Sequence, residues 1–341
     1  MERTELNTLG EFGLIRRIAE HANTGLKKSV KGIGDDAAVW ATGKDEYQLI
    51  STELFIENIH FDLSFAPLKH LGYKVVVAGI SDILAMNGIP HQITLGVGLS
   101  NRFSVEAVDE LYSGVIAACQ EYDVELVGGD TTSSRAGLVL SISALGTVAK
   151  DRVAYRKGAS ANDIICVSGD LGGAYLGLQL LEREKRVFLE NPESQPILAG
   201  NEYVLQRQLK PDARLDIVRQ LKELDIIPTS MIDVSDGLAS ELLHLAAESG
   251  LGVRIFEEQL PIHQKTFLAA TELKLGPITA ALNGGEDYEL LFTIRQDDYQ
   301  KILDHTTDIS FIGFMSADPA EALLITKANE AIELTAQGWE K

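Results

Sequence analysis

The sequence predicts an α/β or α+β fold divided into two domains. The chain has 341 residues, a length that favours two domains. Strand and helix patterns are mixed in both halves. After Lys150 the segment AYRKGASANDIICVSGDLGG is typical of a polar crossing followed by a new strand. We therefore expect an N-terminal domain over residues 1–150 and a C-terminal α/β domain over residues 151–341.

The N-terminal half contains helical and strand patterns in alternation. Leu9–His21 has apolar residues at helical spacing, and Pro67 begins a long apolar helix that Gly88 ends. Short apolar runs rich in β-branched residues indicate strands. The helices expected here are Leu9–His21, Pro67–Met86 and Val105–Tyr122, and the strands are Ala37–Trp40, Gln48–Thr52, Ile93–Leu99, Val124–Val127 and Leu138–Val148.

The C-terminal half repeats this mixture. Phe188–Gly200 contains two prolines among polar residues and is expected to be a loop. The helices expected are Gly172–Glu184, Glu202–Leu209, Asp212–Leu224 and Leu238–Ser249, and the strands are Ile164–Ser168, Met231–Val234, Val253–Glu257, Tyr288–Ile294, Ile309–Met315 and Leu323–Lys327.

Composition narrows the classes of partner and compartment. The formal net charge is −20, from 50 acidic and 30 basic residues, which disfavours nucleic acid and anionic membranes as partners. Cys119 and Cys166 are the only cysteines, which favours a reducing compartment and two buried thiols. The N-terminus lacks an apolar signal region, and no apolar run is long enough for a membrane span. We therefore expect a cytoplasmic protein.

Acidic residues recur in one context, at the end of an apolar run beside Gly, Ser or Thr. A single one is an ordinary turn or helix-cap residue, but many unpaired charges beside apolar runs are costly. Converging carboxylates raise one another's pKa values unless a cation neutralises them, and Mg²⁺ prefers carboxylates together with substrate phosphates. The pattern therefore predicts metal-bridged phosphate binding. Its members are Asp35, Asp36, Glu53, Asp82, Asp130, Asp233, Asp236, Glu286 and Asp287.

The turn GIGDDAA resembles a dinucleotide-binding loop in its small residues but not in its charge. Gly32, Gly34 and Ala37 match the spacing, whereas Asp35 and Asp36 would repel a bare phosphate. They suit a Mg²⁺ ion that the phosphates share, so we expect Asp36 to be a direct ligand and Asp35 to be structural. A phosphate-binding P-loop, an H-E-x-x-H zinc motif and a G-x-S-x-G nucleophile motif are all absent from the sequence.

Six motifs occur in a fixed order along the chain: GIGDDAA, STELFIENIHF, KVVVAGISDILAMNG, LVGGDTT, MIDVSDGL and LNGGEDYELLFT. Together they resemble the thiamine-monophosphate kinase family, whose superfamily includes aminoimidazole ribonucleotide synthetase and selenophosphate synthetase. The resemblance runs from Glu11 to the terminal GWEK. It implies ATP- and Mg²⁺-dependent phosphorylation of thiamine monophosphate to thiamine diphosphate. It also implies an N-terminal ATP- and Mg²⁺-binding domain whose sheet forms a barrel across a homodimer.

The resemblance also implies site residues, position by position. Metal ligands are expected at Asp36, Ser51, Thr52, Glu53, Asp82, Asp130, Asp233 and Asp236. ATP is expected at Tyr112, Gly129, Asp130, Arg156 and Ser235, and thiamine monophosphate at His60, Glu286 and Trp339. The chain departs from the family pattern with Glu53 in place of a usual Asp, Asn58 in place of a usual Gly, and Ser133 and Ser134 before Arg135.

Two other functions remain open at this point. One is another ATP-dependent synthetase of the same superfamily, although no cysteine lies near the N-terminus to handle selenium. The other is a divalent-cation or nucleotide-binding protein without catalysis. Product analysis separates the first from a kinase, and a turnover assay separates the second.

Overall fold

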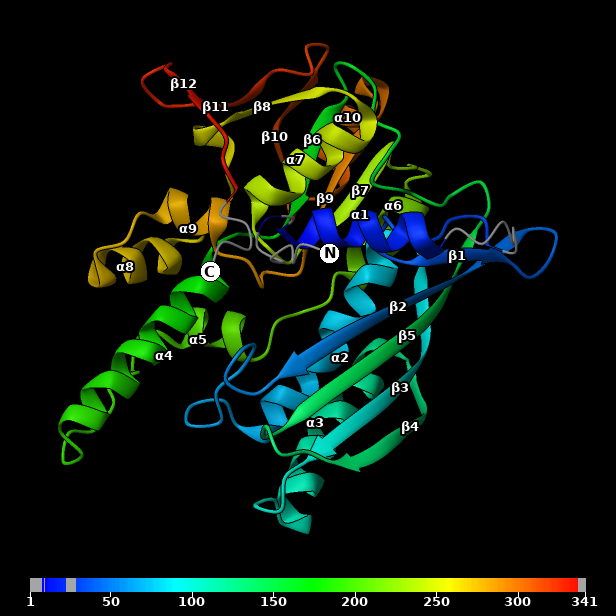
Figure 1. Cartoon of the computed structure of the whole chain (residues 1–341). Coiled ribbons are helices and arrows are strands. Elements are labelled where there is room, and N and C mark those ends of the chain that lie inside the picture. The colour runs from blue at the N-terminus through cyan, green and yellow to red at the C-terminus, as the bar shows by residue number, and fades with distance from the viewer. Residues whose placement is uncertain (1–7, 9, 23–28, 337–341) are drawn as a thin grey trace.

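The protein is described by a computed structural model that covers residues 8, 10–22 and 29–336. Helix α1 (Gly10–Ala22) precedes two β-sheets, and further helices pack between and around them (Figure 1). Strands and helices alternate through both halves, which confirms the mixed α/β class. One sheet ends at Ala149 and the other begins at Ile164, while the assignment of two domains meeting at residue 150 stays a prediction.

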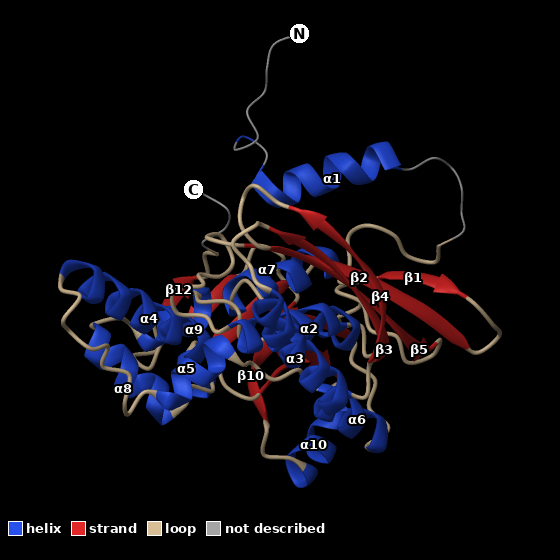
Figure 2. Cartoon of the chain, turned by 90° about the horizontal axis from the view of Figure 1, so that it is seen from below, coloured by secondary structure: helices blue, strands red, loops and turns tan. Residues whose placement is uncertain are grey.

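The first sheet has five strands in the order β1-β2-β5-β3-β4. β3 and β4 are parallel, and the other pairs are antiparallel. Helices α2 and α3 lie together on one side of this sheet (Figure 2). The elements are β1 (Ala38–Ala41), β2 (Glu46–Ile56), α2 (Leu68–Ala85), β3 (Ile89–Leu99), α3 (Val105–Tyr122), β4 (Glu125–Ser133) and β5 (Val139–Ala149).

Strand β4 continues through the GGDTT motif, where the sequence indicated a strand ending at Val127. The continuation needs a glycine, because a Cβ atom on Gly129 would lie 2.0 Å from the carbonyl oxygen of Leu95 in β3. The missing side chain therefore lets the two strand backbones approach closely. Asp130 consequently lies within a strand and not at a turn. Strands β2 and β3 are also longer than predicted.

Helices α2 and α3 cross with their backbones in near contact. A Cβ atom on Gly114 would lie 1.8 Å from the carbonyl oxygen of Lys69, and one on Gly72 would lie 2.0 Å from that of Leu111. Two glycines therefore define the crossing, one on each helix. Helix α2 is buried along most of its length, which is unusual for a helix at the surface of one sheet.

The second sheet has seven strands in the order β12-β11-β8-β10-β6-β9-β7. Helices α4, α5, α8 and α9 pack against one another beside it (Figure 1). The strands are β6 (Ile164–Ser168), β7 (Ser230–Val234), β8 (Gly252–Phe256), β9 (Glu289–Ile294), β10 (Ile309–Ser316), β11 (Ala322–Ile325) and β12 (Ala331–Glu333). The helices are α4 (Gly173–Glu190), α5 (Glu202–Leu209), α6 (Leu215–Glu223), α7 (Leu238–Ser249), α8 (Gln264–Leu273), α9 (Pro277–Asn283) and α10 (Tyr299–His305).

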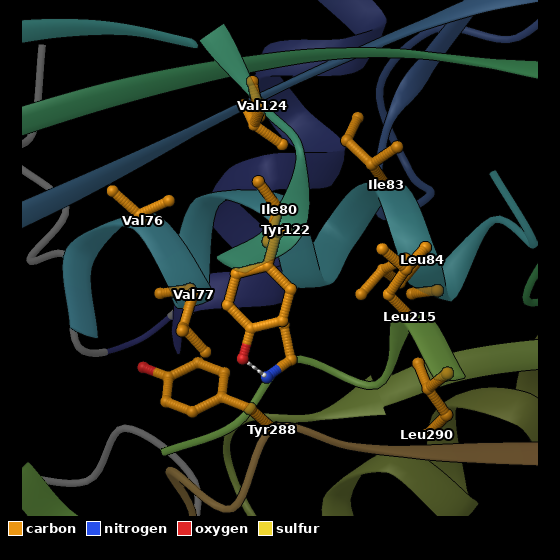
Figure 3. Packing of buried hydrophobic residues seen from close by; sticks show 14 of the residues in the cluster. Val76, Val77, Ile80, Ile83, Leu84, Tyr122, Val124, Leu215, Tyr288 and Leu290 are labelled. Carbon is orange, nitrogen blue, oxygen red and sulfur yellow. Dashed lines mark hydrogen bonds between the residues drawn. The ribbon is translucent and has the colours of Figure 1, made fainter. Parts of the chain in front are cut away.

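Helix α2 lies between the two sheets. Alternate residues of β9 point to opposite sides, so Leu290 joins the core around α2 and Leu291 joins the core around α7. Figure 3 shows Leu290 and Tyr288 on the side of Val77 and Leu84 of α2. Any side chain that α2 presents is therefore fixed relative to both sheets.

The structure corrects several predicted boundaries. Helix α4 continues to Glu190, so the expected loop Phe188–Gly200 begins later, next to Pro192. Three short helices, α8, α9 and α10, and the edge strand β12 were not predicted. Cys119 and Cys166 are buried free thiols, as expected. Within the described ranges, no helix combines the length and apolar character needed to cross a membrane.

Candidate functional site

Three predicted metal ligands meet at the junction of the two sheets. Asp36 lies in the loop before β1, Asp82 in α2 and Asp233 in β7. Each offers one carboxylate oxygen, and these three atoms lie within 4.8 Å of one another. We call these residues the carboxylate cluster. Their separation in sequence is large, so the cluster depends on the packing of α2 between the sheets.

A hydrogen bond ties α2 to the second sheet at this point. Ser81 Oγ donates to Asp233 Oδ2 at 2.6 Å, and both residues are buried. Because Asp233 belongs to β7 and Ser81 precedes Asp82 in α2, this bond fixes one carboxylate beside the other. Ser81 was not singled out from the sequence, although its place beside Asp82 in GISD was visible.

The electrostatics of the cluster favour a bound cation. Burial raises the pKa of Asp36 to about 7, against the opposing effect of Arg156 and with a further rise from Asp233. Burial and the charges of Asp233, Glu53 and Asp36 raise the pKa of Asp82 well above its ordinary value. Burial also raises the pKa of Asp233 to about 6, although the Ser81 hydrogen bond opposes the rise. A divalent cation would offset both the loss of solvation and the mutual repulsion that raise these pKa values.

One oxygen of Asp36 is free to bind a ligand. Arg156 donates to Asp36 Oδ1 from Nε at 3.0 Å and from its terminal nitrogen at 2.5 Å. Among the described residues, the buried Asp36 Oδ2 has no hydrogen-bond partner. Asp35 instead accepts a hydrogen bond from the Arg156 backbone N–H at 3.1 Å and pairs with Lys31 at 3.1 Å. Each oxygen of Asp35 therefore has a partner, since Oδ1 accepts the Arg156 hydrogen bond and Oδ2 lies in the Lys31 ion pair, whereas Asp36 Oδ2 has no such partner among the described residues.

Further acidic residues extend the cluster. Glu53 is close enough for its charge to raise the pKa values of both Asp82 and Asp233. The backbone N–H of Asp236 donates to Glu241 Oε1 at 2.9 Å. Glu241 is buried in α7, and its burial together with the charge of Asp236 raises its pKa well above the ordinary value. Glu241 was missed from the sequence because it follows the motif MIDVSDGL inside an ordinary helical pattern.

The other three predicted ligands, Ser51, Thr52 and Asp130, belong to strands of the first sheet. Ser51 is buried and donates from Oγ to the carbonyl oxygen of Gly79 in α2 at 3.1 Å. Thr52 points to the other face of β2, where it bonds Ser143 of β5. Asp130 of β4 pairs with Gly96 of β3, Gly96 pairs with Ser141 of β5, and Ser141 pairs with Leu54 of β2. Paired residues lie on one face of a sheet, and Leu54 is two residues from Thr52, so Asp130 and Thr52 share a face. The structure therefore does not bring Thr52 or Asp130 to the carboxylate cluster.

The residues predicted to bind the nucleotide are spread over two places. Tyr112 of α3 packs against the apolar core, and Gly129 lies beside Asp130 in β4. Ser235 follows β7 and accepts a hydrogen bond at its carbonyl oxygen from the Glu286 backbone N–H at 2.7 Å. Arg156 and Ser235 thus lie on the side of the second sheet, whereas Tyr112 and Gly129 belong to the first.

A cavity of about 740 Å³ contains predicted substrate residues from both halves of the chain. His60 and Glu286 line it together with Ser235 and Asp236, so a molecule in the cavity reaches the residues that follow Asp233. Trp339 lies outside the described residues. The cavity is also lined by Lys74 and Gln208, which the sequence reasoning missed. The sequence signal that could have revealed Lys74 was a single charged residue within the otherwise apolar run LGYKVVVAGI.

The local geometry of His60 makes it a hydrogen-bond donor. The Ile56 backbone N–H donates to His60 Nδ1 at 3.1 Å, so the neutral ring carries its proton on Nε2. Asn58 begins this turn with φ of 65°, a left-handed conformation that Gly adopts freely and Asn tolerates. The change from Gly to Asn in this chain is therefore compatible with the turn that presents His60.

Comparisons with known proteins give consistent results. A family described as AIR synthase related protein, N-terminal domain, matches residues 34–148. The chain is 34% identical to thiamine-monophosphate kinase of Aquifex aeolicus (strain VF5), over 88% of this chain and 91% of the relative. It is 31% identical to thiamine-monophosphate kinase of Escherichia coli (strain K12), over 97% of this chain and 98% of the relative.

Solved structures agree with these sequence matches. A structure described as AaThiL complexed with AMPPCP and TMP superimposes with a TM-score of 0.83 and 30% identity, covering 99% of each chain. E. coli HypE, a hydrogenase maturation protein, superimposes with a TM-score of 0.68 at 18% identity, covering 98% of this chain and 89% of that one. At that identity the second likeness concerns the fold alone.

Proposed function

Because this chain belongs to the thiamine-monophosphate kinase family, we propose that it transfers the γ-phosphoryl group of ATP to thiamine monophosphate and forms thiamine diphosphate. The observation that carries the proposal is the carboxylate cluster of Asp36, Asp82 and Asp233 beside a cavity lined by His60 and Glu286. Two anions must approach each other in this reaction, so charge neutralisation and positioning are the main requirements on the protein.

The cofactor we propose is Mg²⁺, in several ions. The unpartnered Asp36 Oδ2 and the mutual repulsion within the cluster fit a hard cation with oxygen ligands. When bound, Mg²⁺ neutralises phosphate charge and orients the transferring group. The ligands proposed are Asp36, Asp82 and Asp233 in the cluster, Glu53 and Asp236 beside it, and Ser51, Thr52 and Asp130 by family resemblance.

ATP is the proposed phosphoryl donor. We propose that Arg156 binds a phosphate, because its guanidinium lies against Asp36 of the cluster and is a planar donor suited to phosphate oxygens. Ser235 follows the cluster strand and lines the cavity. We propose by family resemblance alone that three further residues complete the nucleotide site, namely Tyr112, Gly129 and Asp130. Gly129 and Asp130 belong to β4 of the first sheet, whereas Ser235 follows β7 of the second.

The acceptor chemistry needs no general base. The acceptor phosphate is largely ionised at neutral pH, so one of its oxygens can attack the γ-phosphorus directly. We propose in-line transfer, in which that P–O bond forms while the bond from the γ-phosphorus to the β-phosphate oxygen breaks and ADP leaves. His60 can donate from Nε2–H to the acceptor phosphate. Glu286 and Trp339 are proposed to contact the thiamine rings.

We also propose a homodimer in the cytoplasm. On the face of the first sheet opposite α2 and α3, Leu54 is 49% exposed, and a second copy of the chain would cover it in the proposed dimer. A barrel formed by two such sheets is the arrangement that the family resemblance implies. Two buried free thiols are consistent with a reducing compartment.

Product analysis tests the function against its alternatives. The protein is incubated with ATP, Mg²⁺ and thiamine monophosphate, and nucleotides and thiamine esters are separated. We expect ADP and thiamine diphosphate in equal amounts. AMP or a cyclised imidazole product would indicate a different synthetase of the superfamily, and the absence of any nucleotide product would indicate a binding protein.

A further inference from the structure

Lys74 is a buried cation inside the substrate cavity. It belongs to α2 and is 5% exposed, whereas lysines are almost never fully buried unless they are paired. Its Nζ donates to the main-chain carbonyl oxygen of Gln208 at 2.9 Å and lies 3.1 Å from Glu286 Oε1. Lys74 therefore joins α2 to two segments of the C-terminal half, within the wall of the cavity.

Glu286 is held on both of its carboxylate oxygens. Lys74 pairs with Oε1, and Gln208 Nε2 donates to Oε2 at 2.9 Å. The backbone of Glu286 is fixed as well, with φ of 59° and its N–H bonded to Ser235 O. We call Lys74, Gln208 and Glu286 the clamp. Because both oxygens of Glu286 are engaged, the clamp holds its side chain in one orientation in the cavity wall.

The clamp determines which end of the Gln208 amide faces Glu286. A carboxylate accepts hydrogen bonds, so the NH₂ group must face it and the carbonyl oxygen Oε1 must face away. Gln208 is 5% exposed, and among the described residues its Oε1 has no hydrogen-bond partner. A buried unpaired acceptor costs about 1–3 kcal/mol, so a ligand that supplies an N–H donor gains from meeting it.

Thiamine monophosphate has one group that bears N–H donors, the exocyclic amino group of its aminopyrimidine ring. We propose that Gln208 is a specificity-determining residue, whose Oε1 accepts a hydrogen bond from this amino group. Glu286 orients the side-chain amide, and Lys74 holds both Glu286 and the main chain of Gln208. The inference rests on the proposed function, because it takes the substrate from there. Asp236 lines the same cavity, so the substrate can contact Gln208 with one end and the metal-binding residues with the other.

A cycle of protein and substrate changes tests the proposal. The substrates are thiamine monophosphate and its analogue in which a hydrogen atom replaces the amino group. The variants are Gln208→Met, which removes the acceptor at similar length, and Gln206→Met, a control at an exposed position of the same helix α5. A site built to bind an N–H group rejects a partner that lacks it by unpairing a buried polar atom.

We expect wild type and Gln206→Met to prefer the amino substrate in kcat/KM by about 10–100-fold, and Gln208→Met to lose most of this preference. A Gln208→Met enzyme that slows both substrates by the same factor and keeps the preference would overturn the proposal. Should this variant fail to fold, wild type alone decides, because equal kcat/KM for the two substrates would also overturn it. If wild type turns over neither substrate, the proposed function itself fails, which is a distinguishable result.

Discussion

Replacing Asp233 by Asn should stabilise the metal-free protein at alkaline pH. Asp233 is 4% exposed, and its pKa is raised from 3.8 to about 6 by burial and by neighbouring acids. A raised pKa means that ionisation disfavours the folded state. As pH rises from about 4 to about 6, wild type therefore loses stability that an uncharged asparagine side chain at this position does not lose.

The size of this stabilisation follows from the shift in the pKa of Asp233. A rise of about two pKa units corresponds to about 3 kcal/mol above pH 6. Asn can still accept the hydrogen bond from Ser81, so little packing is lost. For a chain of 341 residues, with an unfolding entropy of about 2 cal/mol/K per residue, this corresponds to a rise in Tm of about 4 °C.

The assay is thermal unfolding in chelator at about pH 8 and about pH 4, with and without Mg²⁺. We expect Asp233→Asn to unfold at a higher temperature than wild type at the higher pH and at an equal temperature at the lower one. Mg²⁺ should raise the Tm of wild type more than that of the variant, because it binds the folded carboxylates. Asp109→Asn, which removes an exposed carboxylate of α3, should change nothing. A metal-free wild type as stable as Asp233→Asn at pH 8 would refute the reasoning.

Three further predictions concern activity and packing. Asp36→Asn should lower kcat by about 100-fold or more without lowering Tm, and wild-type turnover in that variant would remove Asp36 from the metal site. Gly114→Ala should lower the free energy of unfolding by about 3 kcal/mol or more in urea, because the new methyl group meets Lys69 O; an unchanged midpoint would contradict the close helix crossing. Ser81→Ala should lower Tm, and more so at pH 8 than at pH 4, because the ionised Asp233 loses a donor worth about 1–3 kcal/mol; an equal loss at both pH values would argue against an ionised partner.

Much of the fold could be predicted from local pattern. Val105–Tyr122 and Leu238–Ser249 were predicted with the observed bounds, because apolar spacing and helix-ending residues agree there. The long strand β4 could not be predicted past Val127, since GGDTT is typical of a turn when read alone. The GGDTT segment is extended because it pairs with the neighbouring strand β3, against which Gly129 packs. The helices α8, α9 and α10 are short and carry weak patterns.

The site residues likewise divide into those that local motifs indicate and those that only contacts between distant segments reveal. Asp36, Asp82 and Asp233 were predicted to be metal ligands from their motifs, and the structure brings their carboxylates together. Lys74 and Gln208 were missed, because their importance depends on contacts between distant segments and not on any motif. No local pattern indicates that a lysine in α2 will meet a carbonyl group in α5. The assignment of Thr52 and Asp130 stays a prediction, since both lie on the other face of the first sheet.

The most direct test of the account locates the metal ions themselves. Crystals grown with Mn²⁺ in place of Mg²⁺ and with a non-hydrolysable ATP analogue give anomalous difference peaks at the bound ions. We predict at least one peak about 2.1 Å from carboxylate oxygens of Asp36, Asp82 and Asp233, the distance typical of such small hard cations. Peaks confined to other residues, with these three carboxylates free of metal, would contradict the account.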